Sequence, residues 1–238
     1  MSRRRVKRFF IGLLLSIVLI GAALAYTAWR LSWQQPTWYA PPNPKDERIV
    51  RLADDAEYDL LQKTQQMRPE EERWTLRLTA AQLNAWLSAR LPQWIEHDAN
   101  LQWPEQIGTP QVLIDDAGVR VAVPVTTAVG EHPLTRTVVC TLRPAITSDG
   151  RLSLQLTSLA LGKVWVPGEP LTKLVQAVRD AAPEFLGDAR VQQAVEILAG
   201  KATLPAEYDL ADGRRVSIKA VKLASGVIEM TAVTLPPQ

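Results

Sequence analysis

The stretch that decides the fold reads DGRLSLQLTSLALG and covers residues 149–162. Its opening Asp-Gly pair is typical of a tight hairpin turn, and the leucines that follow at every second position are typical of one face of a β-strand. These leucines are Leu152, Leu154 and Leu156. The next two, Leu159 and Leu161, are one residue out of step, which predicts a β-bulge near Thr157 and Ser158.

The same alternation continues on both sides of this stretch and predicts an antiparallel β-meander. Upstream, valines define one face of a strand at Val119, Val121, Val123 and Val125. Turn residues separate the runs at 116–118, 130–133, 149–150 and 212–213. Further strands are expected at 203–210, 214–223 and 227–235. The runs 134–147 and 151–166 hold 14 and 16 residues. Strands longer than the usual ~5–6 residues must twist strongly, so we expect a strongly twisted sheet.

Segments with helical spacing precede the meander, so the predicted fold class is α+β. Apolar residues recur every three or four positions over 46–67, which predicts a first helix. Thr79 and Gln82 have the spacing of a capping box, which predicts the start of a second helix over 80–90. Pro92 is expected to end this second helix, because proline interrupts helical hydrogen bonding.

Two other patterns complete the predicted elements. Alternating apolar residues over 74–78 predict a short strand before the capping box. After the meander, a helical stretch begins at Gly168, breaks at Pro183 and resumes up to Gly200. We expect the long sheet to pack against these amphipathic helices or to wrap around them.

An apolar segment near the amino terminus predicts a transmembrane anchor. Residues 9–29 carry no charge, and as a helix they span about 32 Å, close to the roughly 30 Å of a hydrocarbon core. The basic residues within 1–8 place that tail in the cytoplasm and everything from Arg30 outside, as expected for a single-pass protein of the cell (inner) membrane. The alternative is a cleaved signal peptide, since Ala23-Leu24-Ala25 resembles a cleavage site. The apolar run is longer than the usual ~7–15 residues of such a segment.

The remainder divides into a spacer and one extracytoplasmic domain, over 30–45 and 46–238. Prolines in the spacer favour an extended, semi-rigid segment that holds the domain off the bilayer. Aromatic residues cluster where the predicted span leaves the membrane, as in an interfacial belt: Tyr26, Trp29, Trp33, Trp38 and Tyr39. The only cysteine of the chain, Cys140, excludes an intramolecular disulfide.

Sequence motifs that would indicate catalysis are absent. The chain has no HExxH, GxSxG, phosphate-binding loop or dinucleotide turn, so we expect no enzyme activity, no metal and no cofactor. The Glu-His-Asp run at 96–98 brings three polar groups together, but consecutive side chains point in different directions on a helix or strand. Cys140 shares a strand face with Val138 and Leu142 and is expected to behave as a small hydrophobe.

The charge distribution argues against a nucleic-acid partner. Five of the 27 cations lie within residues 1–8, which leaves 22 cations against 25 acids in the rest of the chain. A basic tail next to an apolar span is a topology signal, and the domain itself is not basic. The expected partners are therefore the membrane and either a lipid or an envelope protein, with no expectation for the oligomeric state.

Two segments carry a resemblance to a known family: LTAAQLNAWLSARL at 78–91 and GRLSLQLTSLALGKVWVPGEPLTKLV at 150–175. They resemble the YpmS-type family of single-span, outward-facing bacterial proteins of unknown function. That family has a helix containing Leu-Asn and a strand leading into Gly-x-x-x-apolar-Pro, which match Leu83-Asn84 and 162–167 here. More distantly, the arrangement is similar to tubular lipid-binding (TULIP-like) domains, in which a bent sheet wraps a helix and leaves a channel for acyl chains.

The long strands, the tether and the resemblance together suggest an extracytoplasmic module that binds or passes a lipid or other amphiphile in the cell envelope. The candidate lining residues are apolar and come from the second helix and the meander. They are Leu83, Trp86, Leu87, Val121, Val123, Leu154 and Leu156. The alternative is an anchored scaffold or interaction domain in which the same residues form a filled core and no ligand binds.

Overall fold

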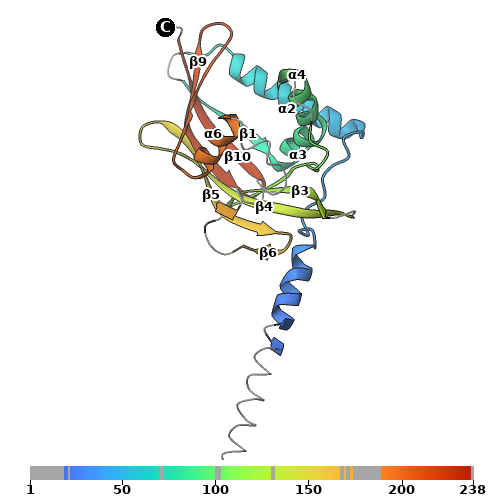
Figure 1. Cartoon of the computed structure of the whole chain (residues 1–238). Helices are drawn as coiled ribbons and strands as arrows, with labels where there is room; N and C mark the ends of the chain where they lie inside the picture. Colours follow the sequence, from blue (N-terminus) through green and yellow to red (C-terminus); the bar gives the residue numbers. More distant parts are fainter. Residues whose placement is uncertain are drawn as a thin grey trace, which may run out of the picture.

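Figure 1 shows the computed structural model of the chain, which describes residues 19–20, 22–69, 72–99, 103–129, 132–166, 169, 172–173 and 189–236. The fold is α+β, as predicted, with helices beside antiparallel sheets. One of the sheets is curled into a half-barrel. Two sheets divide the strands between them, one with six strands and one with four.

The predicted meander forms the larger sheet. Its strands are β2 (Gln111–Asp115), β3 (Gly118–Val129), β4 (His132–Ile146), β5 (Arg151–Leu161) and β6 (Val164–Trp165). A sixth strand, β7 (Leu204–Pro205), joins the sheet by pairing with β5. Consecutive strands from β2 to β6 pair antiparallel, which confirms the meander. β4 holds 15 residues, so one of the two expected long strands is present at full length.

The predicted bulge is confirmed in β5. Thr141 of β4 pairs with Ser158, whereas the next residue, Leu142, pairs with Leu156, so Thr157 has no partner across the strands. The Ser158 hydroxyl donates to Thr141 Oγ1 over 2.7 Å and stabilises the irregularity. Because of the extra residue, the leucines on both sides of the bulge lie on the same face of the sheet.

The second long strand is shorter than its sequence predicts. The alternation runs over 151–166, but β5 ends at Leu161 and the chain turns back into β6, where Val164 pairs with Leu161. Gly162 makes this turn possible, because its φ of +57° lies in the left-handed region that favours glycine. The apolar alternation continues through the turn, and for that reason it does not reveal where the strand ends.

The smaller sheet joins the two ends of the domain. Its strands, in spatial order, are β1 (Arg73–Thr79), β10 (Val227–Leu235), β9 (Arg215–Ala224) and β8 (Glu207–Asp209). Trp74, Leu76, Val216 and Ala232 are buried together and form its core. The Trp74 indole N–H donates to Thr234 Oγ1 over 3.1 Å, so this buried polar atom has a partner.

The strand predicted over 203–210 is divided between the two sheets. β7 pairs with β5 in the larger sheet, and β8 pairs with β9 in the smaller one. Ala206, which lies between β7 and β8, is buried. This segment therefore connects the sheets, a role that its local sequence pattern does not reveal.

Three helices of the domain lie where the sequence predicts them: α2 (Glu47–Gln65), α3 (Ala80–Ala89) and α6 (Ala189–Leu198). A further helix, α4 (Leu91–Ala99), follows α3 and was not predicted. Nearly all of the helical stretch predicted from Gly168 to Pro183 lies outside the described residues. Three buried alanines, Ala53, Ala85 and Ala89, lie in the contact between α2 and α3, where small side chains allow close approach. Pro92 does not end helical structure as expected. It lies in the first turn of α4, where its missing N–H removes no helical hydrogen bond.

The predicted capping box is confirmed at the start of α3, where Thr79 Oγ1 accepts from Gln82 N over 3.2 Å. Thr79→Ala should lower the free energy of unfolding by about 0.5–2 kcal/mol, because an amide N–H of the first turn loses its acceptor. Urea unfolding of the full chain in detergent, followed by tryptophan fluorescence, measures the change. Thr79→Ser keeps the hydroxyl and should unfold close to the wild type; an equal loss in both variants would contradict the cap.

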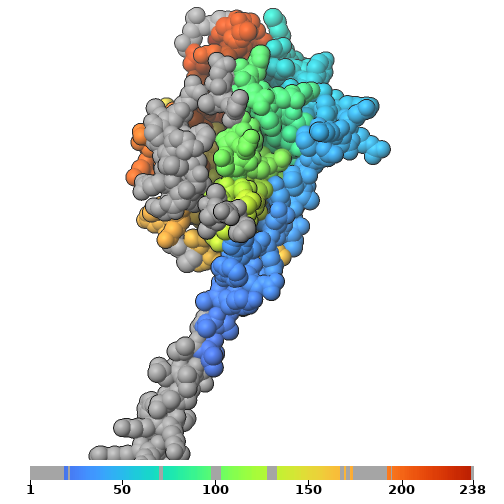
Figure 2. Space-filling view, turned by 45° about the vertical axis from the view of Figure 1, so that its right-hand side comes forward, coloured from blue at the N-terminus to red at the C-terminus, as the bar shows by residue number. Residues whose placement is uncertain are grey.

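Most of the predicted membrane span, residues 9–29, lies outside the described residues. The part that is described, together with the residues that follow, contains a helix over 22–32 with exposed side chains up to Arg30. Within the portions of the chain that the structure covers, no helix has the length and apolar character needed to cross a membrane. Residues 22–32 form a stem that projects away from the domain (Figures 1 and 2).

The predicted spacer does not stand free of the domain, and turns interrupt it at 33–34, 37–38 and 44–45. Its residues 31–42, called the docked segment below, contact β2, α3 and the turn after β5. The Gln111 side chain of β2 accepts from Ala40 N and donates to the Trp38 carbonyl, at 2.6 and 3.2 Å. The Tyr39 hydroxyl donates to Thr109 O over 2.8 Å. The segment that is expected to hold the domain off the bilayer therefore also packs on the domain.

Candidate functional site

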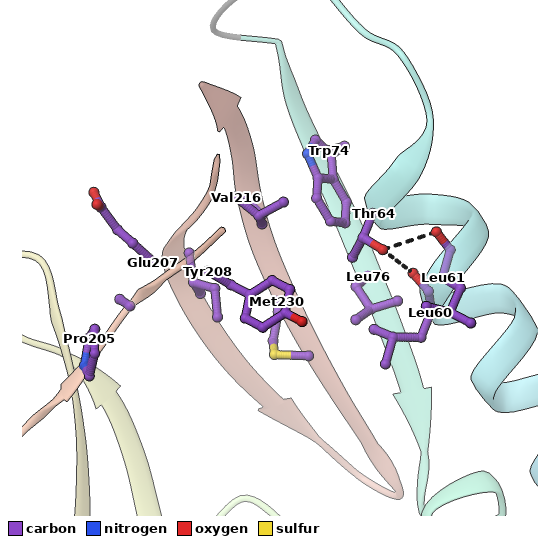
Figure 3. A pocket seen from close by; sticks show the side chains of 13 residues that line it. Leu60, Leu61, Thr64, Trp74, Leu76, Pro205, Glu207, Tyr208, Val216 and Met230 are labelled. Atoms are coloured by element: carbon purple, nitrogen blue, oxygen red, sulfur yellow. Dashed lines mark hydrogen bonds between the residues drawn. The ribbon is translucent and has the colours of Figure 1, made fainter. Parts of the chain in front are cut away.

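An apolar groove of about 370 Å³ lies on the smaller sheet, between the carboxyl-terminal half of α2 and the segment that connects β7 to β8 (Figure 3). Residues from α2, β1, the β7–β8 segment, β9 and β10 line it. They are Leu60, Leu61, Thr64, Trp74, Leu76, Pro205, Ala206, Glu207, Tyr208, Val216, Ile218, Met230 and Ala232. Nearly all of these side chains are apolar, which makes the groove the candidate binding site.

The walls of the groove are exposed, whereas its floor is buried. Trp74 and Leu76 of β1 belong to the core of the smaller sheet. Above them, Leu60 is 38% exposed and Leu61 is 54% exposed, and Tyr208 on the opposite wall is 70% exposed. Figure 3 shows the two leucines on α2 facing Met230 and Tyr208 across the groove. A contiguous apolar surface that is exposed to solvent is typical of a binding site.

The groove continues in both directions along α2. A neighbouring cavity of about 420 Å³ shares Leu61, Thr64 and Tyr208 with it and adds Met67 and Leu210. At the other end, a smaller cavity of about 110 Å³ shares Leu60. The three cavities therefore form one apolar track that follows the helix.

Charged residues at the rim are already paired with protein groups. Arg214 donates to the carbonyl oxygens of Gln65 and Gln66 at 2.8 and 3.2 Å, and it pairs with Asp212 at 2.7 Å. These bonds occupy carbonyls at the end of α2, and the hydrogen bond from Arg214 holds the pKa of Asp212 below its usual value. Asp212 and Arg214 line the second cavity of the track, but their charges are already paired, so the track offers mainly apolar contacts.

The opposite wall shows the same pairing of charges. Glu207 accepts from Arg215 over 2.8 Å, and this hydrogen bond lowers the pKa of the carboxyl group. On the floor side, the Arg68 guanidinium lies over the Trp74 ring, 4.5 Å from its centroid, where burial lowers the pKa of the guanidinium. Arg215 and Arg68 therefore both interact with protein groups at the edge of the groove, outside its apolar interior.

The structure divides the residues predicted to line a site between two places. Leu83 and Trp86 line the smallest cavity of the track, where Trp86 also donates to Glu57. Leu87 lies on the same helix and is half-buried. The other four lie on β3 and β5 of the larger sheet and do not line the track: Val121, Val123, Leu154 and Leu156. Their role in lining a channel stays a prediction.

Most of the residues that line the groove were not identified from the sequence. Leu60 and Leu61 are part of the apolar stripe of the first predicted helix, and the stripe alone suggests core packing. The stripe does carry a usable signal, because it changes from alanines at Ala53 and Ala56 to paired leucines. The buried alanines mark the part of α2 that contacts α3, and the leucines extend beyond that contact.

Three of the polar groups considered for catalysis lie within the described side chains, whereas the side chain of Asp98 lies outside them. Glu96 and His97 are exposed on α4. Burial raises the pKa of the Cys140 thiol to about 11, so the thiol is protonated and weakly nucleophilic at neutral pH. Among the described residues, no group of His, Cys, Asp and Glu side chains could hold a metal ion.

The two short motifs that resemble a known family have structural roles in this chain. Asn84 Nδ2 donates to Val112 O over 2.9 Å, and Asn84 Oδ1 accepts from Val112 N over 2.7 Å. The Asn84 amide thereby binds the outer edge of β2 as a further strand would. Gly162 allows backbone carbonyls of the docked segment to approach the turn after β5.

No protein-family model and no curated protein matches this chain. The features of this chain that bear on its function are therefore the shape and chemistry of the groove and the predicted anchor.

Proposed function

We propose that this protein is a membrane-anchored extracytoplasmic module that binds or passes a lipid or other amphiphile in the cell envelope. The observation that carries the proposal is the apolar track along α2, with exposed leucines above a buried apolar floor. A volume of about 370 Å³ lies within the range of roughly 300–1,000 Å³ that is typical of small-molecule sites.

The chemistry of the track supports an acyl chain as the ligand. Each methylene buried from water contributes about 0.8 kcal/mol, so a chain that buries about ten of them gains roughly 8 kcal/mol before ordering costs. A net gain of about 8 kcal/mol would correspond to a Kd near 1 μM, so ordering costs place the expected Kd above that value. The paired charges at the rim add no strong electrostatic term, which favours recognition of the apolar chain.

The location of the groove supports a membrane-linked role. The uncharged segment 9–29 and the basic tail before it predict a single-pass anchor in the cell membrane with the domain outside. The stem over 22–32 joins the base of the domain, whereas α2 lies on its upper part in Figure 1. We therefore propose a binding site that the anchor holds near the bilayer but outside the hydrocarbon core.

The second candidate function is an anchored scaffold that binds an envelope protein. Exposed Met67 and Tyr208 flank the track, and large apolar side chains of this kind are also enriched at protein interfaces. A peptide or helix could occupy the same open groove. The first function predicts that the full chain binds an acyl probe without a protein partner. The scaffold predicts that it does not.

Leu61→Glu should weaken the binding of a fluorescent fatty acid at least tenfold, because the carboxylate places a charge against the apolar ligand. The full chain is reconstituted in nanodiscs, and cis-parinaric acid emission is measured against empty discs. Tyr58→Glu is the matched control, since Tyr58 is exposed on the same helix and does not line the track. Saturable binding that is equal in both variants would exclude this groove as the site. Absence of binding by the wild type would favour the scaffold.

A further inference from the structure

Aromatic rings form a ladder along one face of the stem and end on a cation of the domain. Tyr26 and Trp29 have ring centroids 6.2 Å apart, and Trp29 and Trp33 have centroids 5.9 Å apart. The Arg136 guanidinium of β4 lies over the Trp33 ring, 4.3 Å from its centroid. The ladder therefore connects the predicted interfacial belt directly to the larger sheet.

The end of the stem contacts the turn between β5 and β6. Lys163 N donates to Leu31 O over 3.2 Å. A Cβ on Gly162 would lie 2.6 Å from both Ser32 O and Gln34 O, so only a glycine allows the two backbones to lie this close. Figures 1 and 2 show the stem joined to the base of the domain at this place. The turn and the stem are therefore packed against each other.

The length of the stem places this turn at the bilayer surface. The predicted span ends at Trp29, and Leu31 follows it by about 3 Å along the helix axis. The headgroup region adds roughly 5–7 Å on each side of the hydrocarbon core. The turn that contacts Leu31 therefore lies at the depth of the lipid headgroups.

The side chains at this depth are cationic or aromatic. Arg30 and Lys163 are exposed, Arg136 is half-buried, and Trp165 is 62% exposed on β6. None of the ion pairs found among the described residues involves any of these three cations. An open cavity of about 490 Å³ separates the stem from the start of β4, lined by Trp29, Arg30, Trp33, Gln34 and Leu134.

We propose that the base of the domain is itself a membrane-binding surface, in which Arg30, Arg136 and Lys163 bind anionic phospholipid headgroups and Trp165 enters the interface. Positive charge next to exposed indole rings complements a bilayer surface that carries phosphate groups. The surface also follows directly on the predicted membrane span. A bilayer is therefore favoured over a soluble anion as the ligand of these cations. This proposal rests on the membrane anchor of the proposed function, and it is independent of what the groove binds.

The test measures the depth of a nitroxide label at Trp165→Cys in the full chain. Half-buried Cys140, with its raised pKa, reacts more slowly than an exposed thiol, and the new thiol is the main labelled site. The chain is reconstituted in phosphatidylcholine vesicles with and without phosphatidylglycerol, and a label at Gln62→Cys on α2 is the control. We expect the label at 165 to be accessible to oxygen and shielded from an aqueous nickel chelate, and the label at 62 to show the reverse.

Charge reversal tests the contribution of the headgroups. With phosphatidylglycerol present, Lys163→Glu should raise the accessibility of label 165 to the nickel chelate several-fold, whereas Lys219→Glu, at an exposed site on β9, should not. Equal nickel accessibility at 165 and 62, in a chain that resists carbonate extraction, would overturn the surface while leaving the anchor intact. A chain released by carbonate would overturn the anchor and this proposal together.

Discussion

Gly162→Ala is expected to lower the free energy of unfolding of the full chain by about 3 kcal/mol or more. The left-handed conformation costs about 1–2 kcal/mol for a residue with a Cβ. The new Cβ would also lie 2.6 Å from two backbone oxygens and 2.8 Å from a third, that of Leu31. Because backbone atoms cannot rotate away as a side chain can, the docked segment must separate from the turn.

Gly150→Ala is the matched control for this prediction. Gly150 has a similar φ of +74°, but no atom lies within 4 Å of its Cβ position, so only the conformational cost of about 1–2 kcal/mol applies. Urea unfolding in detergent measures both variants, and limited proteolysis reports whether the docked segment, residues 31–42, becomes accessible. Similar losses of stability, with the docked segment still protected in both variants, would show that contact with the turn does not hold it.

Asn84→Ala should destabilise the chain by about 2–4 kcal/mol. The Asn84 amide satisfies both the N–H and the C=O of Val112 on the edge strand β2, and Val112 is buried. Removing the amide leaves two backbone groups without a partner, at about 1–3 kcal/mol for each such group. Loss of these two hydrogen bonds should also weaken the contact between α3 and the edge strand β2.

Urea unfolding and hydrogen exchange of the Val112 amide measure the effect of Asn84→Ala. Gln62→Ala removes an exposed amide side chain from α2 and should change stability by less than about 0.5 kcal/mol. Unchanged protection of the Val112 N–H would mean that water or a neighbouring group replaces Asn84. That result would remove the structural reason for the Leu-Asn motif at Leu83-Asn84.

Features fixed by neighbouring residues could be predicted from the sequence. The capping box at Thr79 and Gln82 involves a single turn of helix, and the bulge at Thr157 changes a local alternation. The turn residues at 116–118 and 149–150 separate strands that pair with their sequence neighbours, so this part of the meander follows from local patterns. In each case the residues that form the feature lie within a few positions of one another in the sequence.

Features that join distant segments could not be predicted in the same way. β1 pairs with β10, so Trp74 lies opposite Ala232, and no local pattern indicates that pairing. The groove arises from the placement of α2 over the smaller sheet, whereas the predicted lining residues Val121 and Leu154 belong to the larger sheet. The docked segment similarly depends on Gln111, whose side-chain amide bonds to residues about 70 positions earlier in the chain.

Photocrosslinking with a diazirine-bearing fatty acid shows whether the groove binds an acyl chain. The wild-type full chain is irradiated with this probe in nanodiscs, and the crosslinked residues are identified by peptide mass spectrometry. We expect crosslinks to the carboxyl-terminal half of α2 and to β1, β9 and β10, at positions such as Leu60, Leu61 and Met230, which an excess of unlabelled fatty acid suppresses. Crosslinks confined to the predicted span at 9–29, with none on these groove residues, would show that the groove does not bind the acyl chain.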